Sequence, residues 1–551
     1  MSFVNQITLP QDVLDRVARV MDYHNSTKHT HEQVHLHPHK LDAQNKPYEF
    51  RIFEQVPAVP LPAGVLDLPV NTLNLMENGF AALPGSSPEP PPQDLKTLAT
   101  WLHFADGIAS RKRLVTQTVF TRTCASDGHT FPCEIYIAAF AVEGLEPGLY
   151  HYSPREFVLR KLRGGPETLA RLTRGRPDLA FLKTVPLAML VSTIFCRATW
   201  RFGKRGYRTA LHDAGYLIQN LVTVATGMGV QTMTRLILND AATRDLIGVS
   251  ADADFCESEA VQALVVWADR AQNPSMPPPP VRAAPAARAG PMPPLSRSLL
   301  ANEVTPYVSI ISTHQDCVAP GVAVREVRPP LTDLSPLPPN FPTIDPPINM
   351  DPKPPAGEPL RKILLTRAAT THFGTRALPR QQFYTINRLA FRGGTFFPLH
   401  PDGPHVALVR PLWIIHDKGI DGFEPGVWYY HPLTDQWSHI RNGDYRRQTT
   451  YLALEQPSFG RCAATCFLAV NLHHLMQMAG PDVYRLAHIE AGTVTNRIAL
   501  STEALNLAWF ESGNFYDEEV RQFLGLQATG WEVLNVIAVG SRVEAGQEEK
   551  V

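Results

Sequence analysis

Apolar residues recur along the chain with two periods, and together they predict helices packed on a sheet. Residues 94–108 carry apolar side chains at helical spacing, and residues 213–229 predict a buried helix that ends on glycine. Residues 134–145 and 260–268 have the β-branched and apolar content of strands. A Glu-Pro-Gly turn leads from the first of these strands into another. The predicted fold class is α+β, with helices on a largely antiparallel sheet.

One short stretch of the chain occurs twice. GLEPGLYHYSP begins at residue 144 and GFEPGVWYYHP at residue 422, an offset of 278. Offsets of 276 or 277 relate further pairs: Pro60 and Pro336, Tyr207-Arg208 and Tyr484-Arg485, HDAGYLIQN (212–220) and IEAGTVTNR (489–497), and DAATRDLIGV (240–249) and DEEVRQFLGL (517–526). This period is far too long for a solenoid repeat and matches a whole domain. The pattern indicates a tandem duplication.

The length and a proline-rich segment indicate where the two copies meet. A chain of 551 residues is too long for a single hydrophobic core. Residues 273–298 are rich in Pro and Ala, which favours an extended, stiff spacer. We therefore predict a first domain at 1–272, a linker at 273–300 and a second domain at 301–551. A second proline-rich stretch, 334–359, is expected to lie on the surface of the second domain.

Composition and charge exclude several classes of protein. The net charge of −1 gives no indication of a nucleic-acid or membrane partner. The longest apolar run, 185–196, is shorter than the roughly 20 residues that a bilayer requires. The first residues lack the pattern of a secretory signal, and the seven cysteines are scattered, so we expect a cytoplasmic protein with free thiols. Cys462 and Cys466 are interpreted as buried apolar residues rather than metal ligands.

Five motifs of the first copy occur in the order found in one enzyme family. They are YHNSTKH (23–29), RTCASDGHTFPCEIY (122–136), GLEPGLYHYSP (144–154), WRFGKRGYR (200–208) and HDAGYLIQN (212–220). The chain resembles SagB/ThcOx-type dehydrogenases, FMN-dependent members of the nitroreductase superfamily, over most of copy one and more faintly over 360–545. The resemblance implies an α+β sandwich that dimerises around FMN. We therefore expect two nitroreductase-like α/β sandwich domains that form an intramolecular pseudo-dimer, favoured by the linker.

The resemblance also implies that the two flavin crevices of such a pair are unequal. In the family, one subunit binds the FMN phosphate with an Arg-Arg-Ser-x-Arg segment. Copy two keeps Arg367 of this segment within 364–378, whereas 74–87 of copy one has no basic residue. Guanidinium groups and free helix N–H groups suit a dianionic phosphate. Copy two is therefore expected to supply the phosphate contact.

The other subunit of the family supplies a Pro-Ser-x-Gly-x-x-x-Pro-x-Glu loop to the flavin ring. Copy one retains most of this loop, and 404–414 of copy two retains only its prolines. The two surviving pieces are expected to meet in one crevice, which predicts one FMN per chain. The expected cofactor-binding residues are Arg122, Ser126, Asp127, Gly128, Glu134, Arg367, Glu490, Gly492 and Arg542. Alternatives remain: Glu490 and Gly492 could begin a buried helix, and Arg542 could be a surface charge.

The chemistry implied by the resemblance is the two-electron oxidation of an azoline to an azole. In azole-forming relatives a Lys-Tyr pair follows Trp, where this chain has Arg201 and Phe202, and neither can act as the base. Lys204 and Tyr207 are the candidate catalytic residues, because a buried Lys can lose its proton near neutral pH. The alternative is structural, with Tyr207 packed in the core and Lys204 exposed.

A tract rich in histidine lies near the N-terminus. Imidazoles at i and i+2 would point the same way if the tract were a strand, which would suit a transition metal. The favoured interpretation is a solvated loop near the active-site mouth, so no metal site is predicted. The histidines are His29, His31, His35, His37 and His39, and the neighbouring Tyr23, His24, Thr27 and Lys28 match the family signature.

The predicted function is an FMN-dependent oxidase or dehydrogenase of natural-product biosynthesis. Its substrate would be peptide-linked or derived from an amino acid, and could be carried by a precursor peptide or carrier protein. One alternative is a non-catalytic member that binds a substrate or partner. Another is an NAD(P)H-dependent nitro or quinone reductase, although the chain shows no glycine-rich dinucleotide fingerprint.

Overall fold

The computed structural model describes twelve stretches of the chain, and the statements below concern these residues. They are 9–83, 90–113, 118–174, 176–236, 241–249, 258–268, 295–318, 355, 357–392, 408–432, 434–527 and 529–543. Most of the predicted linker and of the second proline-rich stretch therefore lies outside the described residues, as does Pro404. We call the residues up to 268 the first half and those from 355 the second half.

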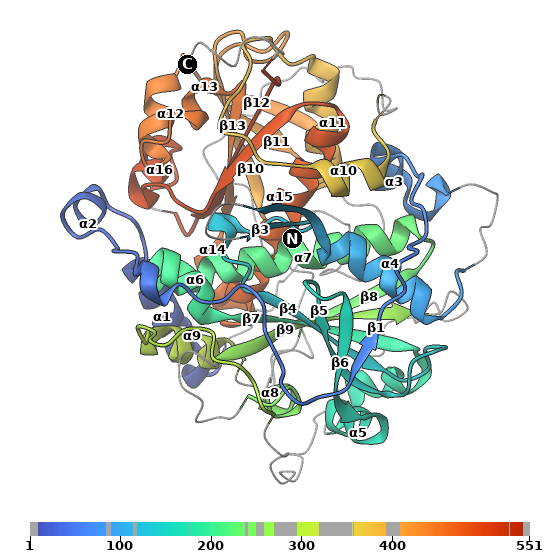
Figure 1. The fold of residues 1–551 in the computed structure, drawn as a ribbon. Coiled ribbons are helices and arrows are strands. Elements are labelled where there is room, and N and C mark those ends of the chain that lie inside the picture. The colour runs from blue at the N-terminus through green and yellow to red at the C-terminus, as the bar shows by residue number, and fades with distance from the viewer. Residues whose placement is uncertain are drawn as a thin grey trace, which may run out of the picture.

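Two antiparallel sheets lie at the centres of the two halves (Figure 1). Their orders are β1-β6-β5-β4-β7-β9-β8 and β12-β11-β10-β13-β15-β14. Apart from β1, the strands follow the same order when they are ranked along each half. The strands are β1 Ala58–Pro60, β4 Cys133–Ala139, β5 Gly148–Ser153, β6 Val158–Gly164, β7 Leu187–Ile194, β8 Gln231–Leu236, β9 Glu259–Ala268, β10 Arg410–Ile415, β11 Gly426–His431, β12 Gln436–Asn442, β13 Ala464–Val470, β14 Ala508–Ser512 and β15 Glu532–Gly540.

Helices cover both sheets, which is why β4, β7, β9, β13 and β15 are buried along their whole length. A separate hairpin of β2 Ile108–Arg113 and β3 Thr118–Arg122 packs near α10. The helices are α1 Gln11–Ser26, α2 His31–Leu36, α3 Thr72–Asn78, α4 Leu95–Asp106, α5 Gly165–Thr173, α6 Phe195–Phe202, α7 Gly206–Gly227, α8 Ala241–Leu246, α9 Val308–Val318, α10 Leu360–Thr366, α11 Arg380–Phe391, α12 Arg446–Leu452, α13 Ser458–Arg461, α14 Leu472–Ala479, α15 Val483–Ala504 and α16 Asp517–Phe523. The predicted α+β class is confirmed.

The two long helices α7 and α15 cross between the sheets at a pair of glycines (Figure 1). A Cβ atom added to Gly215 would lie 1.8 Å from the carbonyl oxygen of Ile489. One added to Gly492 would lie 2.0 Å from the carbonyl oxygen of His212. Residues without a side chain therefore allow the two backbones to touch. Nearly all of both helices is buried, so this crossing forms the core between the halves.

Helix α7 begins seven residues before its predicted start. The prediction placed Asp213 at the helix N-terminus, where a carboxylate favours the helix dipole. Asp213 instead lies inside the helix, because a 3-10 turn at Gly203–Arg205 leads directly into α7 at Gly206. Glu490 likewise lies inside α15. The interpretation that these carboxylates begin helices is therefore wrong.

Helices α1 and α9 also contact the two long helices. The His24 ring of α1 lies 3.4 Å from the Tyr484 hydroxyl of α15. From α9, His314 Nδ1 lies 3.0 Å from the Tyr207 hydroxyl of α7. Residues 295–300 run along 48–54, where the Tyr48 N–H donates to the Leu300 carbonyl at 2.7 Å. The end of the predicted linker thus packs on the first half, and the domain boundaries stay predictions.

A buried ion pair joins α1 to the second half and makes stability depend on pH. Lys28 Nζ lies 3.0 Å from Glu532, and His24 Nε2 lies 3.4 Å from it. Burial alone would raise the pKa of Glu532, but His24 and Lys28 lower it to about 2. A lowered carboxyl pKa adds stability that is present above the unfolded pKa of about 4.3 and is lost as pH falls through the folded value.

We expect Glu532→Gln to destabilise the protein by about 3 kcal/mol at pH 7, because it removes the buried partner of the Lys28 charge and leaves only the more exposed Glu518. The difference from the wild type should shrink between pH 4.5 and pH 2, where the wild-type carboxylate takes up its proton. Urea unfolding at a series of pH values measures this. Glu518→Gln, at the exposed partner of Lys28, is the control, with an expected loss of about 1 kcal/mol or less. A loss that is the same at every pH would contradict the assignment.

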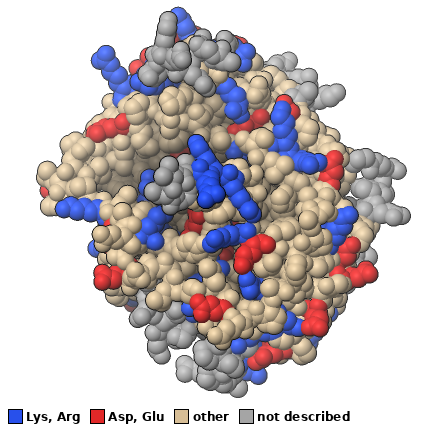
Figure 2. All heavy atoms as spheres, in the orientation of Figure 1, with Lys and Arg blue, Asp and Glu red and all other residues tan. Residues whose placement is uncertain are grey.

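Other predictions from composition can be compared directly. Figure 2 shows positive and negative side chains interspersed over one face, as expected for a net charge of −1. Cys462 and Cys466 are buried and free, which confirms their predicted burial. Among the described helices, none combines the length and apolar character needed to cross a bilayer.

Candidate active site

The loop before β4 is anchored to helix α7. The Ser126 hydroxyl donates to Asp213 Oδ2 at 2.6 Å, and the Asp127 backbone N–H donates to Asp213 Oδ1 at 3.1 Å. Asp127 Oδ2 in turn accepts from the Gly513 N–H of the second half at 3.2 Å. Ser126, Asp127 and Gly128 are only partly buried, so the loop is held in place while solvent reaches it.

Gly128 brings the loop against the end of α6. It has φ of +60°, in the left-handed region that favours glycine. A Cβ atom added there would lie 2.3 Å from the Arg201 side chain and 2.9 Å from the Phe202 ring. Arg201 and Phe202 are the residues that stand where azole-forming relatives carry Lys-Tyr. The structure therefore places these positions beside the loop.

Arg367 reaches from the second half into the first. Its Nε donates to the Thr123 carbonyl at 3.1 Å, and its Nη2 donates to Asn220 Oδ1 at 2.9 Å. The guanidinium also lies over the Tyr216 ring, 5.2 Å from the centroid. Its buried Nη1 has no hydrogen-bond partner among the described residues, and the same holds for the Tyr216 hydroxyl. Two polar groups thus remain available next to the loop.

Three carboxyl groups gather between the loop and β14. Burial raises the pKa of Asp213 well above its usual value, and the neighbouring Asp127 raises it further, although the Ser126 hydroxyl opposes the shift. Burial, with Asp127 and Asp213, also raises the pKa of Glu511 well above normal. Burial raises the pKa of Asp127 as well, although the hydrogen bond from the Gly513 N–H opposes this shift. A raised pKa favours the protonated form of a carboxyl group, which can donate a hydrogen bond or exchange a proton.

Arg122 and Glu134 have their partners inside the first half. Arg122 pairs with Asp106 at 3.1 Å and donates to the Glu49 carbonyl. Glu134 pairs with Arg197 at 2.7 Å and with the His151 ring at 2.8 Å, all nearly without exposure. Ser126, Asp127, Gly128 and Arg367 are thus brought together, whereas these two predicted residues serve ion pairs of the core.

The remaining predicted cofactor residues lie at three places. Glu490 accepts the Leu408 and Val409 backbone N–H groups at 2.6 and 3.2 Å, as Asp213 accepts that of Asp127. Gly492 lies at the helix crossing, so its lack of a side chain is explained by helix packing. Arg542 pairs with Glu503, which also accepts the Ala368 N–H next to Arg367. Arg542 is therefore near the Arg367 segment.

Lys204 and Tyr207, the two candidate catalytic residues, have the positions expected if both are structural. Lys204 is exposed, and its backbone carbonyl accepts from the Tyr23 hydroxyl at 2.6 Å. Tyr207 is fully buried beside His314, and burial raises its pKa well above 10. A phenol with such a pKa stays neutral and cannot act as a base at pH 7.

Sequence reasoning did not single out Tyr216 or Glu511, and it assigned Asp213 to a helix start. Asp213 carried a signal, since Glu490 stands 277 positions later in the repeat and binds the equivalent loop of the second half. No sequence pattern pointed to Glu511, because its neighbours Asp127 and Asp213 come from the other half of the chain.

Residues 86–264 match the Nitroreductase family model. This match covers the loop, β4 and α7. Members of the Nitroreductase family are FMN-dependent oxidoreductases. The chain thus contains a Nitroreductase family domain, which holds most of the first half of the candidate site.

The chain is also similar to a known protein and to several solved structures. The putative nitroreductase MJ1384 of Methanocaldococcus jannaschii is 28% identical over 159 residues, which is 29% of this chain and 76% of that protein. A putative nitroreductase of Anabaena variabilis has a solved structure with a TM-score of 0.70 at 22% identity, covering 95% of this chain and 99% of that one. This shows that both halves together share its fold. A microcin synthetase McbBCD complex of E. coli gives a TM-score of 0.29 at 18% identity, over 46% of this chain and 93% of that chain.

Proposed function

We propose that this protein is a flavin-dependent oxidoreductase that arose by tandem duplication, with one FMN bound between its unlike halves. The observation that carries the proposal is Arg367, which crosses from the second half to the loop and α7 of the first. The duplication is supported by the identical strand order and by the reciprocal contacts of Gly215 and Gly492.

The residues of this crevice fit FMN. Arg367 offers a buried Nη1 without a partner among the described residues, which suits a phosphate oxygen, and Arg542 adds a second positive charge nearby. The loop at Ser126–Gly128 is partly open, and the pKa values of Asp127 on the loop and of Asp213 on α7 are raised, so their carboxyl groups can hydrogen-bond to the polar edge of a flavin ring. FMN bound here would accept two electrons from the substrate as a hydride.

Among the described residues, the opposite crevice differs from the first at the position of Arg367. A bridge between Asn71 and Pro359 joins the starts of α3 and α10, and where α10 is followed by Arg367, α3 is followed by Gly79. Arg497, which stands 277 positions after Asn220, donates to the Leu389 carbonyl and is fully buried. The position equivalent to Asn220 thus holds a buried guanidinium that is bound to a backbone carbonyl of α11. These differences support a single flavin site.

We therefore expect purified protein to be yellow and to release one equivalent of FMN per chain. Heat denaturation followed by absorbance and chromatography of the released flavin measures this stoichiometry. Two equivalents would contradict the unequal crevices, and a colourless protein that does not take up added FMN would contradict a flavin enzyme and favour a non-catalytic binding protein.

We further propose that the substrate is peptide-linked or derived from an amino acid, as in azoline oxidation, and that the protein belongs to the SagB/ThcOx type. The motif order in the first half supports this type. Anaerobic bleaching of the flavin by an azoline-containing peptide tests the reaction. Bleaching by NADPH with nitro or quinone turnover, and none by the peptide, would favour the reductase alternative.

A further inference from the structure

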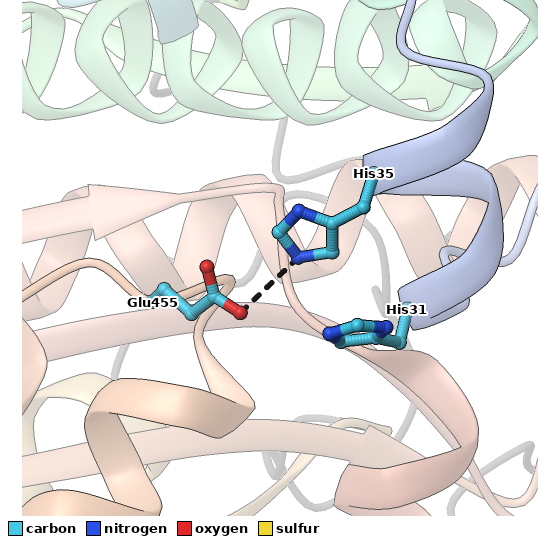
Figure 3. Close-up of side chains that lie close together, drawn as sticks. All are labelled: His31, His35 and Glu455. Carbon is cyan, nitrogen blue, oxygen red and sulfur yellow. Dashed lines mark hydrogen bonds and ion pairs between the residues drawn. The ribbon is translucent and has the colours of Figure 1, made fainter.

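Two histidines and a glutamate converge on the surface (Figure 3). His31 and His35 come from α2, and Glu455 comes from the turn after α12 in the second half. Their potential ligand atoms all lie within 4.8 Å of one another. His35 Nε2 is 3.2 Å from Glu455 Oε1, and the two imidazole rings are 4.3 Å apart.

The local structure explains why these side chains face each other. The favoured interpretation of the tract, a solvated loop, and its alternative, a strand, are both wrong for residues 31–36, which form a helix. The Thr30 side chain caps this helix by accepting the Gln33 N–H at 3.2 Å. On a helix, residues i and i+4 share a face, which places His31 beside His35. The sequence His-Glu-Gln-Val-His has the spacing at which one helix supplies two imidazoles to zinc.

We propose that His31, His35 and Glu455 bind a Zn²⁺ ion. Imidazole nitrogen and carboxylate oxygen are zinc ligands, and a set of two His and one Glu leaves the fourth tetrahedral position for water. Neighbouring ligands of tetrahedral zinc are about 3.3 Å apart, so His35 and Glu455 already have the required separation. Mg²⁺ and Ca²⁺ prefer oxygen ligands and do not suit this set.

Tyr516 lies against two of the proposed ligands. Its hydroxyl donates to Glu455 Oε1 at 3.2 Å and lies 3.0 Å from His35 Nε2. The bond to the carboxylate can orient Glu455, and the loss of such a partner alone weakens metal binding about 10–100-fold. Because α2 has no buried residue, a metal at this point would fasten the N-terminal segment to the second half.

Calorimetric titration of the chelator-stripped full-length protein with ZnCl₂ tests the proposal. We expect one site that His31→Ala weakens at least about tenfold, since it removes a ligand outright. His31 is chosen because the contact of His35 with Glu455 and Tyr516 is left in place. Glu455→Gln should also weaken binding. His37→Ala, an exposed histidine of the same tract outside the cluster, should bind Zn²⁺ like the wild type, and MgCl₂ should give no heat.

Thermal unfolding provides a second readout. Zn²⁺ should raise the Tm of the wild type and of His37→Ala, and should leave that of His31→Ala unchanged. Absence of Zn²⁺ binding to the wild type would overturn the proposal. Equal weakening by His31→Ala and His37→Ala would also overturn it, because it would indicate unspecific binding along the tract.

Discussion

Replacement of either crossing glycine by alanine is expected to destabilise the protein by at least about 3 kcal/mol. At Gly215 the new Cβ would lie 1.8 Å from a backbone oxygen of α15, and at Gly492 it would lie 2.0 Å from one of α7. Neither obstacle is a flexible side chain, so α7 and α15 would have to move apart. That movement would loosen packing along both buried helices. Urea unfolding measures the loss.

Gly164→Ala is the matched control for this experiment. Gly164 has φ of −74°, and a Cβ atom added there meets no atom within 4 Å, so we expect a change of about 0.5 kcal/mol or less. In the double variant, the loss should be smaller than the sum of the single losses, because one substitution already separates the helices. Equal effects at Gly164 and Gly215 would contradict the crossing.

Arg367→Gln is expected to lower FMN affinity by roughly tenfold to a hundredfold. One charge-assisted contact contributes about 1.5–3 kcal/mol, which corresponds to that range. Gln keeps a planar donor that can still reach toward Thr123, so the contact between the halves is partly retained. Arg367→Lys should give an intermediate loss of affinity, since lysine keeps the charge but cannot donate two parallel hydrogen bonds as a guanidinium does. Fluorescence titration of apoprotein with FMN measures the affinities.

Arg361→Gln supplies the control from the other end of α10. Arg361 is exposed and pairs with Asp67 at 2.8 Å, so its loss should leave flavin binding unchanged. The melting temperature of each variant separates loss of flavin from loss of fold. Wild-type affinity in a folded Arg367→Gln protein would show that the phosphate is held elsewhere, and would remove the main support for a shared flavin.

The repeat in the sequence predicted much of the architecture. The strands around residues 144–154 and 422–432 pair in the same way in both sheets, because alternating apolar residues and a Glu-Pro-Gly turn define a hairpin locally. The predicted start of α7 was wrong by seven residues, since Asp213 resembles a carboxylate that begins a helix. In the structure its carboxyl oxygens accept hydrogen bonds from the loop at Ser126 and Asp127.

The candidate site was only partly predictable. The motif residues Ser126, Gly128 and Arg367 were singled out, and the structure brings them together around α7. Glu134 belongs to the same motif but pairs within the core, with Arg197 from α6 and His151 from the neighbouring strand β5. Glu511 was not predicted, because the sequence around β14 does not indicate which residues of the first half lie next to it.

The sequence by itself determined the α+β class, and it contains the repeat and the motifs on which the proposals rest, because these depend on residue spacing within one segment. Only the tertiary structure decided which helix faces meet at Gly215 and Gly492, which half Arg367 reaches, and that His31 and His35 approach Glu455. These contacts join residues more than 140 positions apart. Their energies come from burial and charge pairing between surfaces that no local pattern describes.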